Sequence, residues 1–268
     1  MRRICTLFLL ALLLAGLLPF GAGAEPLWPA AGGTEQRSGK MKLDVSFLTE
    51  GYFLAAIQSP SSHRLKLRVT KDGETLTYDL NSNGDYEVFP LQLGNGNYEV
   101  SLYENVTGKK YSQEGKISLN VRTRLPGVCF LYPNQYVNYN QFSEAVAKAG
   151  ELCAGKSPKE AYAIICDFIR DNFVYDFIKA VTVQAGQLPE IDKSYANRMG
   201  VCQDLSAITV CMLRTQGIPS RLIIGYADNQ YHAWTMTRLG GSEDEFFDPT
   251  AALNAITQVK DYSMERYY

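Results

Sequence analysis

The chain has 268 residues and a mass of 29.9 kDa, which suits one large domain or two domains of ordinary size. Hydrophobic residues make up 46% and charged residues 20%, so the composition supports a packed core and argues against a disordered chain. The formal net charge of −2 argues against a nucleic-acid binder, because such proteins need a dense basic face. Only two histidines occur, His63 and His232, which nearly excludes the common zinc sites, and we expect neither a metal nor another cofactor.

The first 24 residues are typical of a secretory signal peptide. Arg2 and Arg3 precede an apolar run over residues 6–20, and Ala22 and Ala24 fit the small-residue rule for signal peptidase. This run is shorter than the roughly 20 residues that cross a membrane, which favours cleavage after Ala24 over an uncleaved anchor. We therefore expect a secreted protein, extracellular or periplasmic, with no integral membrane segment after cleavage.

Residues 25–40 are rich in Pro, Gly and Ala and are predicted to be a flexible linker. From 41 to 124, short runs of alternating apolar residues are separated by turn-forming sequences; the runs are 43–47, 65–69, 76–80, 98–102 and 117–121. This pattern predicts an antiparallel β-sandwich. Residues 93–98, which end in Tyr98, resemble the tyrosine corner of immunoglobulin-like (Ig-like) domains. No catalytic pattern occurs in this half, and we expect His63 to lie in a solvated loop.

The hydrophobic period changes near residue 124, so residues 125–268 are predicted to form a second domain. A capping box over 157–160 begins a helix that ends near 172, after a shorter helix around 142–152. A third helix is predicted over 202–216, because Gly217 and Pro219 stop it. Strands are predicted at 221–226, 232–238 and 245–248, so we expect an α+β domain in which helices pack on an antiparallel sheet.

Five cysteines remain once Cys5 leaves with the signal, and an odd number in a secreted protein leaves at least one thiol unpaired. Cys202 stands at a predicted helix start, where backbone N–H groups and the helix dipole favour the thiolate and could hold an oxyanion. Cys211 lies in the middle of the same helix and fits an inert buried thiol. Our expectation for a disulfide is Cys129 with Cys153, although spacing does not fix connectivity.

His232 is the histidine placed to serve Cys202 as a base, and Asp248 is placed to orient it. A hairpin centred on Gly240 sets His232 directly opposite Asp248, with Cβ atoms about 5 Å apart. A wider loop through residues 242–244 makes them a diagonal pair that is still within reach. Trp234 shares the face of His232, where it either shields the site from water or packs in the core.

Taken in order, these motifs resemble the transglutaminase-like superfamily, a branch of the papain-like cysteine enzymes. They are Gly-Val-Cys-Gln-Asp at 200–204, Gly-Ile-Pro at 217–219, Gly-Tyr at 225–226, His-Ala-Trp at 232–234 and Asp-Pro-Thr at 248–250. The resemblance covers residues 157–250 and implies a catalytic Cys202, with His232 as base and acid and Asp248 as the orienting residue. The second oxyanion donor stays open, with Asn197 and Gln135 as guesses.

The resemblance implies acyl transfer through a Cys202 thioester on carboxamide or peptide bonds. An amine acceptor gives cross-linking, whereas water gives hydrolysis, as in a protease or amidase. The expected partner is a protein or peptide substrate, with a cell-wall peptide among the candidates. A catalytically silent binding or cell-wall-associated module, or a structural protein that uses Cys202 in a disulfide, stays open beside the enzyme.

Overall fold

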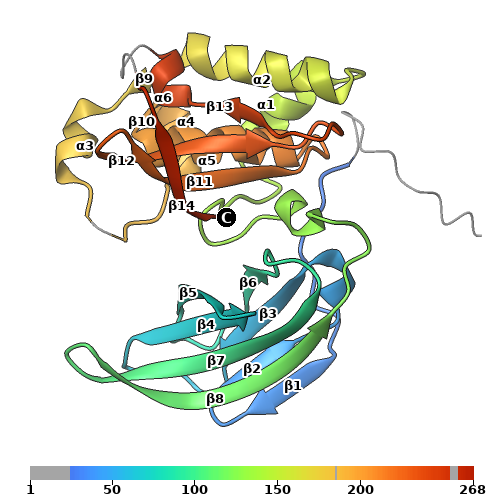
Figure 1. The fold of residues 1–268 in the computed structure, drawn as a ribbon, viewed down its shortest axis with the longest axis vertical. Helices are drawn as coiled ribbons and strands as arrows, with labels where there is room; N and C mark the ends of the chain where they lie inside the picture. The colour runs from blue at the N-terminus through green and yellow to red at the C-terminus, as the bar shows by residue number, and fades with distance from the viewer. Residues whose placement is uncertain (1–24, 185, 254–258) are drawn as a thin grey trace, which may run out of the picture.

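The N-terminal region consists of two four-stranded antiparallel sheets (Figure 1). The computed structural model describes residues 25–184, 186–253 and 259–268, so the predicted signal segment lies outside the described residues. One sheet has the order β1-β2-β3-β6, with bounds β1 Glu35–Ser38, β2 Met41–Asp44, β3 Tyr52–Ile57 and β6 Glu87–Pro90. The other has the order β5-β4-β7-β8, with bounds β4 Leu65–Lys71, β5 Glu74–Leu80, β7 Gly96–Thr107 and β8 Lys110–Val121.

Alternating side chains of the two sheets meet in one shared core. Leu65, Leu67 and Val69 of β4 are fully buried, together with Leu43 of β2 and Phe53 of β3. The period-two runs thus correctly predicted antiparallel strands, because each run buries one face of its strand.

The Tyr98 hydroxyl donates hydrogen bonds to the Gly94 carbonyl (2.7 Å) and the Leu91 carbonyl (3.2 Å), so it fastens the connection that precedes β7. A tyrosine corner makes this kind of contact to backbone a few residues upstream. The Ig-like assignment itself stays a prediction.

Three strands of this region, β1, β3 and β6, lack the alternating signal and were missed. Strand β1 falls inside the predicted linker over 25–40, where it pairs antiparallel with β2 as an exposed edge strand. Strand β3 is buried at every position, because its second face is covered: Tyr52 and Leu54 pack against Val128 and Leu131. A strand buried on both faces reads as a continuous apolar run, so periodicity does not reveal it. Strand β6 has only 4 residues, too few to display a period.

The C-terminal region combines six α-helices with a four-stranded antiparallel sheet among its described residues (Figure 1). The helices are α1 Glu144–Cys153, α2 Pro158–Asn172, α3 Phe177–Thr182, α4 Ile191–Asn197, α5 Cys202–Arg214 and α6 Pro249–Ala252. The sheet has the order β13-β12-β11-β14, with bounds β11 Ser220–Ala227, β12 Gln230–Thr237, β13 Glu245–Phe247 and β14 Tyr262–Tyr267. The strands β9 Val174–Tyr175 and β10 Met199–Gly200 form a short parallel pair.

Helix α5 is the centre of this region. It packs against the strands β11 and β12 and against the helices α1, α2 and α4. Nearly all its residues are therefore buried. The predicted helices at α2 and α5 are confirmed; the Ser157–Glu160 capping box is present, and Gly217 has a left-handed φ of 73° just past α5. The α+β prediction is confirmed in its mixed architecture and antiparallel sheet, whereas β14, α3 and α4 were missed because they are short and carry no clear period.

Arg214 ties segments of the C-terminal region together: the residue is 1% exposed, and its guanidinium donates to the backbone carbonyls of Tyr132, Ser220 and Tyr268 at 2.6–2.9 Å. Side-chain hydrogen bonds also join the two regions. The Gln92 side chain of the N-terminal region donates to the Tyr267 carbonyl of β14. Within the described residues, no helix is both long and apolar enough to cross a membrane.

Candidate active site

Cys202 is the first residue of α5 and is half-buried. The chain reaches it through β10, where Gly200 pairs with Tyr175 of β9. The first backbone N–H groups of a helix have no partner within the helix, so they face the space around this sulfur. The predicted placement of the thiol at a helix start is therefore what the structure has.

The turn before Cys202 is held by the buried carboxylate of Asp204. Its Oδ2 accepts the Val201 N–H (3.1 Å) and its Oδ1 accepts the Glu190 N–H (3.0 Å). Lys179 of α3 lies 2.8 Å from Oδ2 and supplies the opposite charge to a carboxylate that is fully buried. Two separate segments, at Lys179 and at Glu190, are thereby tied to the start of α5.

Gly200 is required by this packing. A Cβ at position 200 would lie 2.8 Å from the Asp204 Cβ, closer than real side chains come. The close approach of Asp204 is therefore the structural reason for a glycine at this position.

His232 on β12 and Asp248 just after β13 meet through a hydrogen bond of 2.8 Å between Nε2 and Oδ2. In the β12–β13 register Thr235 opposes Phe247, and one further residue sets Asp248 opposite Trp234. The pair is therefore diagonal, as expected for the wider hairpin loop, and not directly cross-strand. His232 is 3% exposed and Asp248 is 4% exposed.

The imidazole of His232 holds a proton unusually well. Burial alone lowers its pKa, but hydrogen bonds and charge from Asp248 and Cys202 outweigh burial and raise the pKa to about 9. Because Nε2 is engaged by Asp248, Nδ1 is the ring nitrogen left for the Cys202 thiol. The arrangement keeps a proton on the imidazole beside the Cys202 sulfur at neutral pH.

Asp248 is held by more than His232. Its Oδ1 accepts the N–H groups of Thr250 (2.9 Å) and Ala251 (3.1 Å), which caps α6, and its Oδ2 accepts the Tyr262 hydroxyl at 2.7 Å. Burial raises the pKa of Asp248, but the hydrogen bonds from His232, Tyr262 and Ala251 together hold it below its ordinary value. Tyr262 was missed by sequence reasoning, because β14 carries no motif and pairs with β11 from the end of the chain.

Aromatic rings enclose the imidazole. The Trp234 ring lies 6.3 Å from the His232 ring at an interplanar angle of 25°, and it meets Tyr262 edge-on at 5.1 Å. Trp234 is 3% exposed, so it packs in the protein interior and shields His232 from water at the same time.

Tyr175 is a second residue near Cys202 that the sequence reasoning missed. Burial raises its pKa to about 12, and the negative charge that Cys202 can carry adds to the effect. The signal that could have revealed it is its pairing with Gly200, which depends on a parallel contact between segments 25 residues apart in sequence.

The other predicted residues lie elsewhere or are inert. Cys129, Cys153, Cys166, Cys202 and Cys211 are all free thiols, so the expected Cys129–Cys153 disulfide is wrong. Cys211 is fully buried, and burial raises the pKa of its thiol. Gln135 does not serve the site, since its side chain bonds Glu87 and the Asp79 carbonyl, and Asn197 is exposed at the end of α4. Among the described residues no group of three or more His, Cys, Asp or Glu could hold a metal.

A family model matches the part of the chain that contains Cys202 and His232. Residues 147–247 match the model of the family described as the transglutaminase-like superfamily, which confirms the resemblance. An uncharacterized protein of Mycobacterium leprae is 26% identical over 151 residues, which are 52% of this chain and 50% of that protein. The chain thus spans about half the length of this curated relative.

Two solved structures share 15–16% identity with the chain. A candidate cysteine protease from Cytophaga hutchinsonii has a TM-score of 0.40 over 81% of this chain and 78% of its own. The periplasmic domain of TgpA from Pseudomonas aeruginosa has a TM-score of 0.39 over 82% of this chain and 73% of its own. These scores are low, so the functional assignment rests on the family match and on the geometry of the site.

Proposed function

Because residues 147–247 match the transglutaminase-like superfamily, we propose that this chain is a cysteine-dependent acyl-transfer enzyme. Cys202 is the nucleophile, His232 the general base and acid, and Asp248 the residue that orients the imidazole. The observation that carries the proposal is the buried His232 ring, which bonds Asp248 at 2.8 Å through Nε2 and whose pKa is raised by Asp248 and Cys202 together.

The first half-reaction makes a thioester. The sulfur anion of Cys202 attacks a carboxamide or peptide carbonyl, whose electron pair moves onto oxygen beside the N–H groups that begin α5. When the carbonyl re-forms, the C–N bond breaks and the leaving amine takes the proton from His232. The acyl group is now bonded to sulfur, and the imidazole is neutral.

The second half-reaction frees the enzyme. An incoming amine or water gives a proton to His232 as it attacks the thioester carbonyl, and the C–S bond breaks to return the sulfur anion. An amine yields a cross-link, and water yields hydrolysis by a protease or amidase activity. Protein and peptide carbonyls, cell-wall peptides included, are the proposed substrates.

Export and domain organisation belong to the same proposal. The basic and apolar start of the sequence supports a signal peptide cleaved after Ala24 and a location outside the cytoplasm. The two N-terminal sheets support an Ig-like domain over 41–124, which precedes the catalytic domain over 125–268.

A glutamine-containing peptide library, incubated with and without a primary amine and read by mass spectrometry, tests the reaction. Wild-type protein is expected to ligate the amine, deamidate glutamine or cleave the peptide, and each product is distinguished by its mass. Cys202→Ala should lose about 10⁴-fold or more in turnover, whereas Cys166→Ala, a buried thiol on α2, should keep it. Full turnover by Cys202→Ala would refute the mechanism.

Alkylation covers the case in which no library substrate reacts. Iodoacetamide should modify Cys202 fast at pH 7 if the sulfur is paired with an imidazolium. Modification as slow as that of Cys211, together with no reaction in the library, would refute the enzyme and favour the silent binding module.

A further inference from the structure

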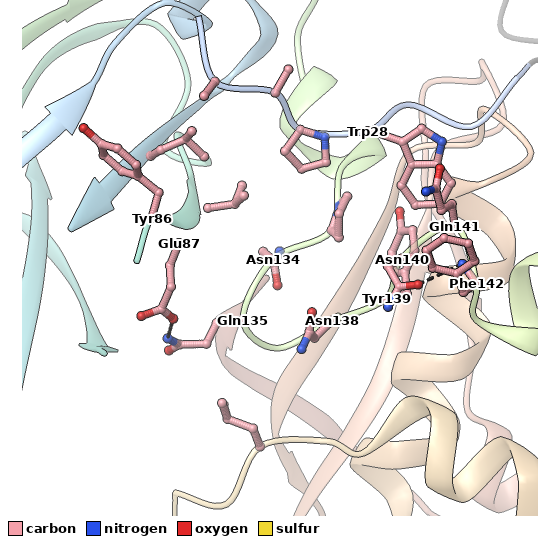
Figure 2. Close-up of a pocket in the computed structure, with 17 residues that line it drawn as sticks. Trp28, Tyr86, Glu87, Asn134, Gln135, Asn138, Tyr139, Asn140, Gln141 and Phe142 are labelled. Atoms are coloured by element: carbon pink, nitrogen blue, oxygen red, sulfur yellow. Dashed lines mark hydrogen bonds between the residues drawn. The ribbon is translucent and has the colours of Figure 1, made fainter. Parts of the chain in front are cut away.

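A cavity of about 920 Å³ opens between the two regions of the molecule (Figure 2). One wall comes from the N-terminal sheet, at Leu54 and residues 86–88, and the other from residues 133–142, which precede α1. Residues 28–31 and Leu188 complete the lining. None of Cys202, His232 and Asp248 lines this cavity, so the proposed chemistry leaves it without a role.

The C-terminal wall is rich in side-chain amides. Five lie within eight residues of sequence: Asn134, Gln135, Asn138, Asn140 and Gln141. Figure 2 shows the Gln135 side chain reaching across to Glu87 of β6. Asn138 lies between Gln135 and the rings of Trp28 and Phe142 (Figure 2). Gln135 donates to Glu87 and the Asp79 carbonyl, and Asn140 Oδ1 accepts the Phe142 N–H at 2.8 Å, whereas the amides of Asn138 and Gln141 make no hydrogen bond among the described residues. An amide both donates and accepts, so these two suit a ligand whose groups do both.

Asn134, in the same wall, has one buried amide donor without a partner in the described part of the chain. It is 5% exposed, and its Oδ1 accepts the N–H groups of Tyr136 and Val137, both at 3.0 Å, which fixes the orientation of the amide. Its Nδ2 is buried and has no hydrogen-bond partner among the described residues. A buried donor without a partner costs about 1–3 kcal/mol, so such groups are rare unless something else satisfies them.

Aromatic rings face the amides. Trp28 and Phe142 lie on one side of the cavity and Tyr86 on the other (Figure 2). Phe142 is 83% exposed although it is apolar, and the Trp28 ring is held edge-on against Tyr139 at 5.9 Å. Exposed aromatic faces around a concave site typically bind the flat apolar side of a ligand.

The charged residues that line the cavity indicate which chemical classes of ligand it can bind. The described residues that line the cavity include no lysine or arginine, so it lacks the cations that phosphate or carboxylate ligands need. Glu87 is the one carboxylate among them, and that group already accepts from Gln135 at 3.0 Å. A lipid chain would strip water from the amides of Asn138 and Gln141 without replacing their hydrogen bonds, which is unfavourable.

We propose that this cavity, the amide–aromatic pocket, binds a neutral oligosaccharide. Sugar hydroxyls both donate and accept, which matches the amides of residues 134–141, and the C–H face of a sugar ring can stack on Trp28 or Phe142. The pocket does not depend on Cys202 chemistry, and its ligand goes beyond the proposed acyl transfer.

The pocket also has a structural connection to the thiol. Leu188 lines the pocket, and the preceding Gln187 carbonyl accepts a hydrogen bond of 3.1 Å from Gln203, the neighbour of Cys202. A sugar bound here would contact the segment that adjoins the start of α5, so a glycan-bearing substrate could engage the pocket and the thiol together.

Isothermal titration of the full chain with cellotetraose, maltotetraose and chitotetraose tests the proposal. At least one should bind, and Phe142→Ala, which removes an exposed ring, should weaken that binding by about tenfold. Trp28→Ala should weaken it at least as much. Phe177→Ala removes an exposed ring from α3, outside the pocket, and should leave binding unchanged.

Two outcomes would overturn the proposal. The first is no binding of any of the three sugars by a folded wild-type protein, and the second is binding that both pocket variants retain. An amide-rich peptide that binds in place of the sugars would also refute the carbohydrate assignment. Titrating Cys202→Ala in parallel separates this result from the proposed enzyme activity, because the sugar should bind that variant with wild-type affinity.

Discussion

Each of the two regions contains one of the chain's two histidines, and each histidine lies near a carboxylate. The pair is exposed in one region and buried in the other. His63, in the N-terminal region, has a side chain that is 59% exposed and lies 3.7 Å from Glu104. The His232 side chain in the C-terminal region is 2% exposed, as is that of Asp248, which bonds it at 2.8 Å. Burial in a low-dielectric site makes the second pair strong and also costly.

The same contrast extends to the other ion pairs. In the Lys116–Glu99 ion pair of the N-terminal sheets both side chains are about half exposed, so the pair contributes little to stability. Lys179–Asp204 joins a lysine that is 16% exposed to a carboxylate that is fully buried at the start of α5. A fold keeps such costly groups inside when they position something, and here Asp204 holds the turn that leads into Cys202.

Replacing each histidine in turn is the strongest test of the difference between the buried and the exposed pair. His232→Ala should reduce turnover by about 10⁴-fold, because the thiol loses its base and the leaving amine loses its proton donor. His63→Ala should change turnover by less than about twofold. Steady-state kinetics on a substrate from the peptide screen measures both, and equal effects of the two substitutions would remove the catalytic distinction between the regions.

Asp248→Asn should have the next largest effect. The variant keeps an oxygen that can cap α6 but loses the charge that steadies the imidazolium, so turnover should fall by about 10³-fold. Circular dichroism should show an intact fold, since the N–H groups of Thr250 and Ala251 still find an acceptor.

The pH dependence of stability sharpens the same test. His232 has a folded pKa of about 9 against an ordinary 6.5, so its stabilising effect is full below pH 6.5 and is lost as pH rises towards 9. The pKa of Asp248 is lowered from 3.8, so its effect is present above that pH and is lost on acidification. Both effects are present between pH 3.8 and pH 6.5. In that range urea unfolding should show the largest excess in the free energy of unfolding of wild type over Asp248→Asn, on the order of 2 kcal/mol. An advantage that grows above pH 9 would contradict the pairing.

Two lysines near Glu190 test the buried ion pair. Lys179→Met leaves the Asp204 carboxylate buried without its cation, and we expect a loss of about 2 kcal/mol in the free energy of unfolding. Lys193→Met removes an exposed lysine that contacts Glu190 alone, and should cost less than about 0.5 kcal/mol. Urea titrations of the two variants measure the difference, and equal losses would contradict a special role for Asp204.

Tyr262→Phe should have the smallest effect. It removes a hydrogen bond of 2.7 Å to Asp248 while keeping the ring against Trp234, so we expect a loss of about 1 kcal/mol and about fivefold in turnover. Tyr103→Phe, which loses an exposed bond to Gln113, serves as the control. An unchanged pH profile and turnover for Tyr262→Phe would show that the hydroxyl does not position Asp248.

Local pattern predicted much of the framework. The capping box at Ser157, the stop at Gly217 and the alternating runs around Leu65–Lys71 are set by residues within a turn or two of each other, so they survive any tertiary arrangement. The same holds for Cys202 at a helix start. Strand β3 escaped prediction because burial on both faces erases alternation, and β1 because a short exposed edge strand resembles a linker.

The sequence by itself determined which groups could carry chemistry and their order along the chain: a thiol at a helix start, an imidazole on one strand and a carboxylate after the next. Only the tertiary structure decided that His232 and Asp248 pair diagonally, that Tyr262 joins them from the end of the chain, and that Lys179 neutralises Asp204. It also decided that amides and aromatic rings from both regions enclose one pocket. The physical reason is that periodicity and capping depend on neighbours in sequence, whereas these contacts depend on how separate elements pack around the buried helix α5.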